Sequence, residues 1–171
     1  MRIGILTSGG DAPGMNAAVR AATLVALGGG AEVIGIRHGY RGLLDGDLIP
    51  LAAAQVVGAL REGGTLLGSA RLREFVRRDV RDRARAVLAE RGIDGLIVIG
   101  GNGSLTGALA LTDPAELGDQ PLRMVGVPAS IDNDIALTGL SIGVDTAMNT
   151  IVEALDKITD TATSHDRTFL V

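Results

Sequence analysis

The chain has 171 residues, the length of one ordinary domain, and 46% of them are hydrophobic, which provides a core and argues against intrinsic disorder. Its net charge of −4 and aromatic content of 2% argue against a nucleic-acid-binding protein, which needs basic surfaces and stacking platforms. Cysteine is absent and no apolar run approaches the roughly 18 residues of a membrane helix, so we expect a cytoplasmic protein without disulfides, thiolate chemistry or membrane contact.

Apolar runs alternate with longer helical patterns along the chain. In chain order, the predicted elements are a strand at 2–7, a helix at 14–27, a strand at 32–36, helices at 52–64 and 75–91, strands at 94–100 and 123–128, and a helix at 145–158. The last two strands are continuous apolar runs, which are typical of a parallel sheet covered on both faces. The alternation therefore predicts an α/β fold with a doubly wound, mostly parallel sheet in a Rossmann-like three-layer sandwich.

The final residues 167–171, RTFLV, have the pattern of a further strand. No internal repeat or linker interrupts the pattern before them, so residues 1–171 are expected to belong to one domain. A domain rarely ends where a strand begins. We therefore expect this chain to be the front part of a longer polypeptide.

Two glycine-rich loops, TSGGDAPGMN at 7–16 and GGNGSLTG at 100–107, each connect a predicted strand to a predicted helix. Ligands bind beyond the carboxyl ends of strands in an open parallel sheet, and helix N-termini favour anions. Two such loops indicate a ligand with several phosphates or two phosphorylated ligands, although each loop alone is equally well explained as a tight turn. Neither is a Walker loop or a Gly-x-Gly-x-x-Gly fingerprint, and the second strand ends at Arg37 rather than at an acid, which disfavours NAD.

A third loop carries two carboxylates, Asp132 and Asp134, in the stretch VGVPASIDNDI. Two acids in a turn are more often solvated turn formers than catalysts. Beside phosphate-binding loops, however, carboxylates either bind Mg²⁺ or take a proton from an attacking hydroxyl, which is the chemistry of a kinase. Arg71 follows a Gly-Gly turn and is a candidate source of positive charge, although composition alone favours an ordinary surface arginine.

Five motifs occur in an order and spacing that are specific to a known family. They are TSGGDAPGMNAAVR, GGTLLGSAR, VIGGNGSLTGA, PASIDNDI and DTATSHDR. Over essentially all 171 residues the chain resembles the N-terminal half of the bacterial ATP-dependent 6-phosphofructokinase family. The resemblance implies the phosphofructokinase N-terminal domain fold, with residues 1–171 forming the nucleotide-binding and catalytic-base domain. It also implies that the family's sugar-phosphate-binding half is absent from this chain.

The same resemblance implies roles for individual residues. ATP would contact Gly10, Tyr40, Arg71, Leu72, Gly101, Asn102, Gly103, Ser104 and Gly107. Fructose 6-phosphate would contact Ser130, Ile131 and Asp132, and Arg167 would reach the sugar phosphate bound by a neighbouring subunit of a homotetramer. Asp132 is implied as the general base on the 1-hydroxyl, Asp134 as support for Asp132 and for Mg²⁺, and Arg71 as the contact to the transferring phosphoryl group.

Asn102 departs from the family pattern, which usually has a Mg²⁺-binding aspartate at that position. An amide offers a carbonyl oxygen but no charge, so weaker metal binding is expected. Small residues at Gly103 and Ala129, where pyrophosphate-using relatives tend to have aspartate and lysine, favour ATP as the donor. Two functions remain: a phosphofructokinase that makes fructose 1,6-bisphosphate in glycolysis, or a catalytically impaired or non-catalytic nucleotide-binding paralogue or fragment. We expect little activity from the isolated 171 residues.

The resemblance also has consequences for regulation. The family uses arginines to bind anionic allosteric effectors. At the matching positions Arg20 is kept, but Leu24, Ala53 and Thr159 replace arginines. Because an anionic effector would lose most of its counter-charge, weak or absent regulation by phosphorylated effectors is expected.

Overall fold

A computed structural model describes residues 1–117 and 122–170 and places the strands in one five-stranded sheet of order β3-β2-β1-β4-β5. The strands are β1 (Arg2–Ser8), β2 (Glu32–Ile36), β3 (Leu48–Pro50), β4 (Gly95–Gly100) and β5 (Arg123–Pro128). Neighbouring strands are parallel except for the antiparallel pair of β2 and β3. The mostly parallel sheet expected from the sequence is therefore confirmed.

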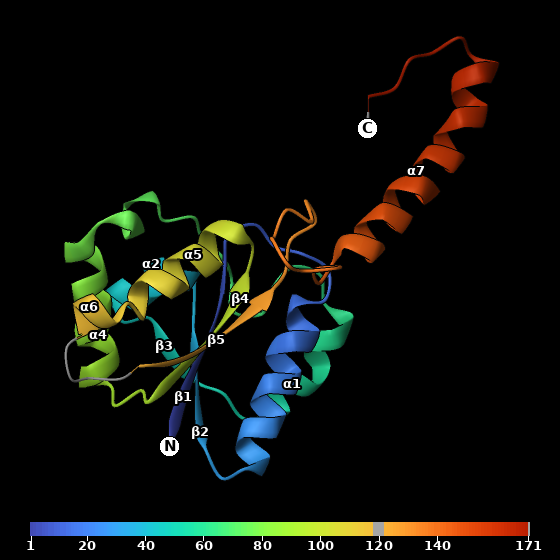
Figure 1. Ribbon diagram of the computed structural model, residues 1–171. Coiled ribbons are helices and arrows are strands. Elements are labelled where there is room, and N and C mark those ends of the chain that lie inside the picture. The colour runs from blue at the N-terminus through green and yellow to red at the C-terminus, as the bar shows by residue number, and fades with distance from the viewer. Residues whose placement is uncertain (118–121, 171) are drawn as a thin grey trace.

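Helices cover both faces of the sheet (Figure 1). They are α1 (Met15–Gly28), α2 (Gly39–Asp45), α3 (Ala53–Val57), α4 (Arg78–Glu90), α5 (Asn102–Leu111), α6 (Pro114–Leu117) and α7 (Val144–Ser164), with 3₁₀ turns η1 (Gly58–Arg61) and η2 (Arg73–Val76). Successive residues of a strand point to opposite faces. Ile5 accordingly belongs to the core under α1 and α3, and Leu6 to the core under α2, α4 and α5. This arrangement confirms the three-layer α/β sandwich.

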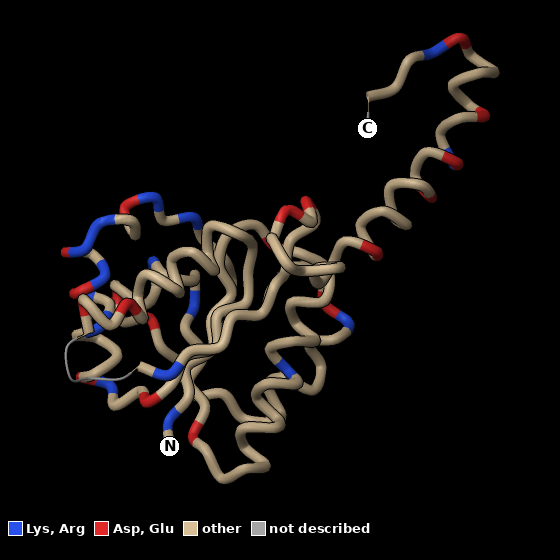
Figure 2. The backbone as a smooth tube through the Cα atoms, in the orientation of Figure 1, with Lys and Arg blue, Asp and Glu red and all other residues tan. Residues whose placement is uncertain are grey.

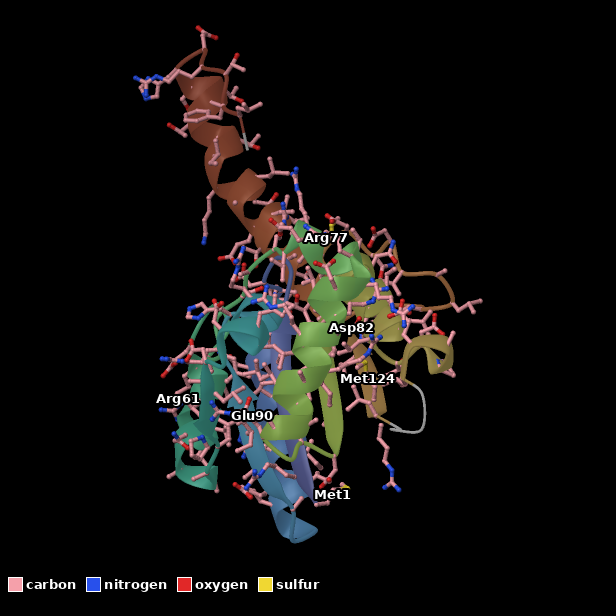
Figure 3. All side chains as sticks on the ribbon, turned by 90° about the vertical axis from the view of Figure 1, so that its left-hand side faces the viewer. Met1, Arg61, Arg77, Asp82, Glu90 and Met124 are labelled. Carbon is pink, nitrogen blue, oxygen red and sulfur yellow. The ribbon has the colours of Figure 1, made fainter. Side chains whose placement is uncertain are left out.

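Helix α4 shows how the hydrophobic pattern builds one of these layers. Val80, Ala84 and Leu88 follow one another at four-residue spacing, and all three are buried against the sheet. Arg77 and Asp82 lie on the outer side of the same region (Figure 3), and both side chains are at least half exposed. The buried stripe therefore orients the helix, with Asp82 on its exposed side and the largely buried Arg81 and Arg85 paired with Glu116.

The helix predicted at residues 52–64 is too long. Helix α3 ends at Val57, and a 3₁₀ turn and an irregular loop follow it. Gly58, Gly63 and Gly64 weaken helix formation in this segment, and Gly64 has a positive φ of 70°, which ends any helix. The apolar periodicity of the segment indicated a helix, but the glycines limited its length.

Other predicted bounds also change. The helix predicted at 75–91 begins later, because η2 occupies its first residues, and the last helix continues past 158 to Ser164. The short elements α2, β3 and α6 were not predicted. The strand predicted at 167–171 is wrong for 167–170, which have no regular structure, and Val171 lies outside the described residues.

Helix α7 extends away from the sandwich (Figure 1), and none of its residues is buried. Its apolar side chains Met148, Ile151, Val152 and Leu155 are each at least 44% exposed. Hydrogen bonds within the helix hold it. They include those that the Thr150 and Thr159 hydroxyls donate to carbonyl oxygens one turn earlier. In the described ranges, no helix combines the length and the apolar composition that a bilayer crossing requires.

The sheet register brings the ends of three strands to one edge. Ser8 of β1 pairs with Gly100 of β4, and Gly100 pairs with Pro128 of β5. Just beyond β5, the backbone N–H of Ala129 donates to the Gly100 carbonyl oxygen over 3.0 Å. The loops after β1, β4 and β5 therefore leave the sheet at the same level, where the sequence predicted a ligand site.

Candidate active site

A cavity of about 800 Å³ lies beyond this edge of the sheet, between the loops after β1, β4 and β5 and the segment around η2. Of the residues singled out from the sequence, those that line it are Gly10, Tyr40, Arg71, Leu72, Gly101, Asn102, Gly103, Ser104, Gly107, Ala129, Ser130, Ile131, Asp132 and Asp134. The glycine loops and the carboxylates thus share one cavity. Placement on opposite faces of the sheet would have excluded a kinase site.

The first glycine loop turns sharply between β1 and α1. Gly9 and Gly14 have positive φ angles of 94° and 95°, which glycine adopts without steric cost. A side chain at Gly9 would start 3.2 Å from the Ser104 hydroxyl oxygen, so glycine lets the two loops approach one another. The backbone of this loop therefore borders the cavity closely, as contact with phosphates requires.

Side chains from β1 and α1 hold the segment that carries Arg71. The Asn16 amide donates to the Glu62 carbonyl over 3.1 Å and accepts from the Leu66 N–H over 2.7 Å. The Thr7 hydroxyl donates to the Gly68 carbonyl over 2.8 Å, on the same segment. A guanidinium nitrogen of Arg71 lies 3.9 Å from the point where a side chain at Gly10 would begin. Positive charge therefore faces the first glycine loop across the cavity.

The second glycine loop leads directly into α5. Gly101 precedes the helix, and its carbonyl oxygen accepts hydrogen bonds from the N–H groups of Ser104 and Leu105. No heavy atom lies within 4 Å of the point where a side chain at Gly103 would begin, so the backbone there faces open space. The helix N-terminus presents unpaired N–H groups and a partial positive charge to the cavity. This geometry suits a phosphate group.

An aromatic pair forms the inner wall of the cavity. The rings of Tyr40 and Phe75 stack with centroids 3.9 Å apart and an interplanar angle of 19°. The Tyr40 hydroxyl donates to the Ser104 carbonyl over 2.7 Å, and burial raises the pKa of Tyr40 well above its usual range. A side chain at Gly107 would start 3.1 Å from the Phe75 ring, so glycine is needed for close packing. Sequence reasoning selected Tyr40 but missed Phe75, whose signal in the sequence is that it is one of only two phenylalanines.

The carboxylates lie on the loop that follows β5. Asp132 and Asp134 are exposed, and both line the cavity. The Asp132 backbone N–H donates to the Ser130 hydroxyl oxygen over 3.3 Å. Two acceptor groups therefore face a cavity that otherwise presents backbone N–H groups and arginine. This combination suits the removal of a proton from a hydroxyl beside bound phosphates.

The donor set also suits Mg²⁺. The described residues contain no group of three or more His, Cys, Asp and Glu side chains that would hold a metal by themselves. Mg²⁺ in phosphoryl-transfer sites instead uses one or two carboxylates together with substrate phosphates and water. Asp132 and Asp134 supply such carboxylates, and the Asn102 amide, which lines the same cavity, supplies a neutral oxygen.

Comparison with known proteins decides the family. Residues 2–171 match the family described as Phosphofructokinase. The chain belongs to the phosphofructokinase family. ATP-dependent 6-phosphofructokinases from Thermotoga neapolitana and Lactobacillus gasseri are 51% and 54% identical to it over 170 residues. These alignments cover 99% of this chain but 52% and 51% of the relatives, so the chain spans about half the length of the curated relatives it matches.

Solved phosphofructokinase structures have the same fold. The phosphofructokinase of Saccharomyces cerevisiae superposes with a TM-score of 0.87 at 41% identity, over 96% of this chain and 24% of that one. A pyrophosphate-dependent phosphofructokinase from Marinobacter aquaeolei gives a TM-score of 0.77 at 23% identity, over 91% of this chain and 42% of that one. The second likeness shows the fold alone. Together they confirm the α/β fold class that the resemblance implied.

One residue implied by the phosphofructokinase resemblance lies apart from the others. Arg167 follows α7, where its backbone N–H donates to the Ala162 carbonyl over 2.9 Å, and it does not line the cavity. The structure therefore does not bring Arg167 together with the other implied residues. Its implied partner is the sugar phosphate of a neighbouring subunit, and that role stays a prediction.

Two further arginines line the cavity of this phosphofructokinase-family chain and were missed. They are Arg73 and Arg81, in a strongly basic stretch of the chain (Figure 2). The Arg81 guanidinium donates to the Val76 carbonyl over 2.6 Å and pairs with Glu116. Hydrogen bonds from Arg81 and Arg85 lower the pKa of Glu116 to about 2. Arg81 therefore holds η2 and the adjoining cavity wall. No local sequence pattern indicates the pairing of Arg81 with Glu116, because the two residues are 35 positions apart.

Proposed function

We propose that the protein containing this chain transfers the γ-phosphoryl group of ATP to the 1-hydroxyl of fructose 6-phosphate and forms fructose 1,6-bisphosphate, a step of glycolysis. The observation that carries the proposal is the shared cavity, in which two glycine loops, Arg71 and the carboxylates Asp132 and Asp134 meet. Family membership and relatives named ATP-dependent 6-phosphofructokinase support it.

The cavity residues divide into two groups by chemistry. Backbone N–H groups at Gly10 and Gly103 and the Arg71 guanidinium bind the phosphates of ATP. The Tyr40–Phe75 stack and Gly107 form the wall on which the rest of the nucleotide lies. The remaining contacts implied for ATP are Leu72, Gly101, Asn102 and Ser104. ATP is favoured over pyrophosphate because Gly103 borders open space and the nearby Ala129 has a small side chain.

The carboxylate loop carries the sugar-phosphate side of the reaction. Ser130 and Ile131 contact fructose 6-phosphate, and Asp132 accepts the proton of its 1-hydroxyl as that oxygen attacks the phosphoryl group. Asp134 keeps negative charge beside Asp132, and Asp134 and the Asn102 oxygen are the groups that would hold Mg²⁺. Mg²⁺, when bound, neutralises charge on the phosphates. Arg167 contributes to a neighbouring subunit's site in a cytoplasmic homotetramer.

A second candidate function rests on one observation. Asn102 places a neutral amide at the start of α5, where the family usually has a metal-binding aspartate. A protein that binds nucleotide without turning it over would tolerate this exchange. It would have no need of the proton acceptor Asp132, which is why we favour the enzyme.

The two functions are separated by assaying the complete polypeptide that contains this chain. Fructose 1,6-bisphosphate formation is measured with ATP or with pyrophosphate as donor, and ATP binding is measured by calorimetry. Turnover with ATP and little with pyrophosphate is the expected result. ATP binding without turnover from either donor, at any Mg²⁺ concentration, would favour the non-catalytic function. Turnover from pyrophosphate alone would contradict the proposed donor.

A further inference from the structure

The loop between Ala129 and Ile142 carries both carboxylates, and its ends are hydrogen-bonded to the sheet. Ala129 and Ile142 form a parallel bridge, and the Ile142 N–H donates to the Pro128 carbonyl over 3.0 Å. Among the described residues, no ion pair or side-chain hydrogen bond involves the carboxylate of Asp132 or of Asp134. The positions of the two carboxylates therefore depend on what holds the loop backbone.

Asn133, between the two aspartates, closes this loop from within. Its side-chain oxygen accepts from the Ser141 N–H over 3.0 Å, and its side-chain nitrogen donates to the Gly139 carbonyl over 3.2 Å. Both partners lie on the returning half of the loop. Asn133 does not line the cavity, whereas Asp132 and Asp134 do. One side chain thus links the two halves of the loop while its neighbours face the substrate side.

Ser141 extends this link to the start of the loop. It is buried, and its hydroxyl donates to the Ser130 carbonyl oxygen. The Ser130 hydroxyl in turn accepts from the Asp132 N–H over 3.3 Å. A continuous chain of contacts therefore connects Asn133, through Ser141 and Ser130, to the backbone of the proposed base.

The backbone conformation of Asn133 is also unusual. Its φ of 49° lies in the left-handed region, which asparagine adopts more readily than most residues because its short amide bonds to nearby backbone. A residue in this conformation turns the chain sharply. The turn places Asp132 and Asp134 on the cavity side, with the Asn133 amide directed into the loop.

We propose that Asn133 is a positioning residue for phosphoryl transfer, acting through Asp132 by fixing the loop that carries it. The inference rests on the proposed function, because positioning matters only if Asp132 takes the proton of the attacking hydroxyl. A small displacement of a catalytic group lowers turnover strongly while leaving binding at remote contacts intact. The nucleotide loops after β1 and β4 lie outside this loop, so ATP binding is not expected to depend on Asn133.

The test uses the complete polypeptide with Asn133→Gly, which keeps the left-handed backbone accessible and removes both side-chain bonds. We expect kcat to fall by about tenfold to a hundredfold while KM for ATP stays within about twofold of the wild type. Asn149→Ala is the matched control, because it removes an exposed amide bond to the Asp145 carbonyl within α7. This control should leave kcat unchanged.

A double-mutant cycle separates positioning from a merely structural role. In an Asp132→Ser background, Asn133→Gly should lower residual turnover by less than about twofold, because the group that it positions is already gone. Amide hydrogen exchange should become faster across residues 130–141 but not across 102–111. An equal loss in both backgrounds, near-normal turnover of Asn133→Gly, or unchanged exchange would overturn the inference. An inactive wild type would overturn the proposed function as well, so the two failures are distinguishable.

Discussion

Helices α5 and α7 both begin beside the candidate site, each just after a glycine, but only α5 packs against the sheet. Helix α5 follows Gly101 and buries Ala108 and Leu111. Helix α7 follows Gly143, whose φ is 103°, and buries no residue. The packing of α5 fixes where its N-terminus points, whereas α7 is held by its own internal bonds and by its connection to the carboxylate loop.

This difference explains which implied site residues the structure brings together. Residues carried by the sheet edge and by α5, such as Gly10 and Gly103, are placed by a shared core and line one cavity. Arg167, carried beyond α7, has no such support and lies apart from the cavity. Proximity to a site along the chain is therefore not enough to position a residue. Packing against the sheet places the glycine loops, and internal hydrogen bonds hold the loop that carries Asp132 and Asp134.

The largest expected effect is on catalysis. Asp132→Ser in the complete polypeptide should lower turnover by a factor on the order of 10²–10⁴, the usual contribution of a positioned base. The affinity for fructose 6-phosphate should fall much less. The same change on α7, Asp156→Ser, serves as the control and should leave steady-state kinetics unchanged. Near-normal turnover of Asp132→Ser would remove this residue from the role of base.

Stability should also distinguish the two helices. Leu111→Ala removes a fully buried side chain of α5 and should lower the free energy of unfolding of the 171-residue chain by about 2–5 kcal/mol. Leu155→Ala on α7, where the leucine is 44% exposed, should change it by less than about 0.5 kcal/mol. Urea titrations followed by circular dichroism measure both. Equal losses would show that α7 is packed in solution.

Asn102 tests the metal requirement of the site. Asn102→Asp adds a carboxylate, which is a preferred Mg²⁺ ligand, at the first residue of α5. We expect higher turnover or a lower Mg²⁺ requirement, measured as rate against free Mg²⁺ concentration. Asn149→Asp adds the same charge on α7 and should change neither. If Asn102→Asp also changes neither, the metal is held through Asp132 or Asp134.

Acid stability provides a smaller contrast. The pKa of Glu116 falls from its ordinary 4.5 to about 2, because Arg81 and Arg85 donate hydrogen bonds to its carboxylate. A lowered folded-state pKa contributes stability above pH 4.5, and this is lost as the pH falls toward 2. Glu116→Gln should therefore lower stability at pH 7 and reduce its decline in acid. Glu153→Gln, in an exposed pair with Lys157 on α7, should alter neither. Parallel melting curves at several pH values measure this difference.

The smallest expected effect is on regulation. Leu24 on α1, Ala53 on α3 and Thr159 on α7 supply no charge at positions where the phosphofructokinase resemblance implies arginines. ADP or phosphoenolpyruvate should therefore shift half-saturation by fructose 6-phosphate by less than about fivefold, the lower end of common allosteric coupling. A sigmoidal substrate curve that either compound shifts strongly would contradict this expectation.

The sequence by itself determined the central sheet and which loops meet at its edge. Continuous apolar runs at 94–100 and 123–128 predicted parallel strands covered on both faces. Both strands are parallel, but only β4 is buried, whereas β5 lies at the edge of the sheet and none of its residues is buried. Glycine-rich loops after such strands predicted the phosphate-binding edge, because helix N-termini and free backbone N–H groups attract anions. The ordered motifs then identified the family. These inferences rest on local pattern, which a linear sequence contains in full.

Only the tertiary structure decided how the remaining side chains act. The Tyr40–Phe75 stack, the bonds of Arg81 to Glu116 and the closure of the carboxylate loop by Asn133 join residues that no periodicity relates. The predicted strand at 167–170 failed for the same reason. An apolar run becomes a strand only when another strand pairs with its backbone, and none of the described strands does so. The local sequence pattern determines which residue types each loop and helix carries, whereas long-range contacts determine which of these side chains lie together in the folded chain.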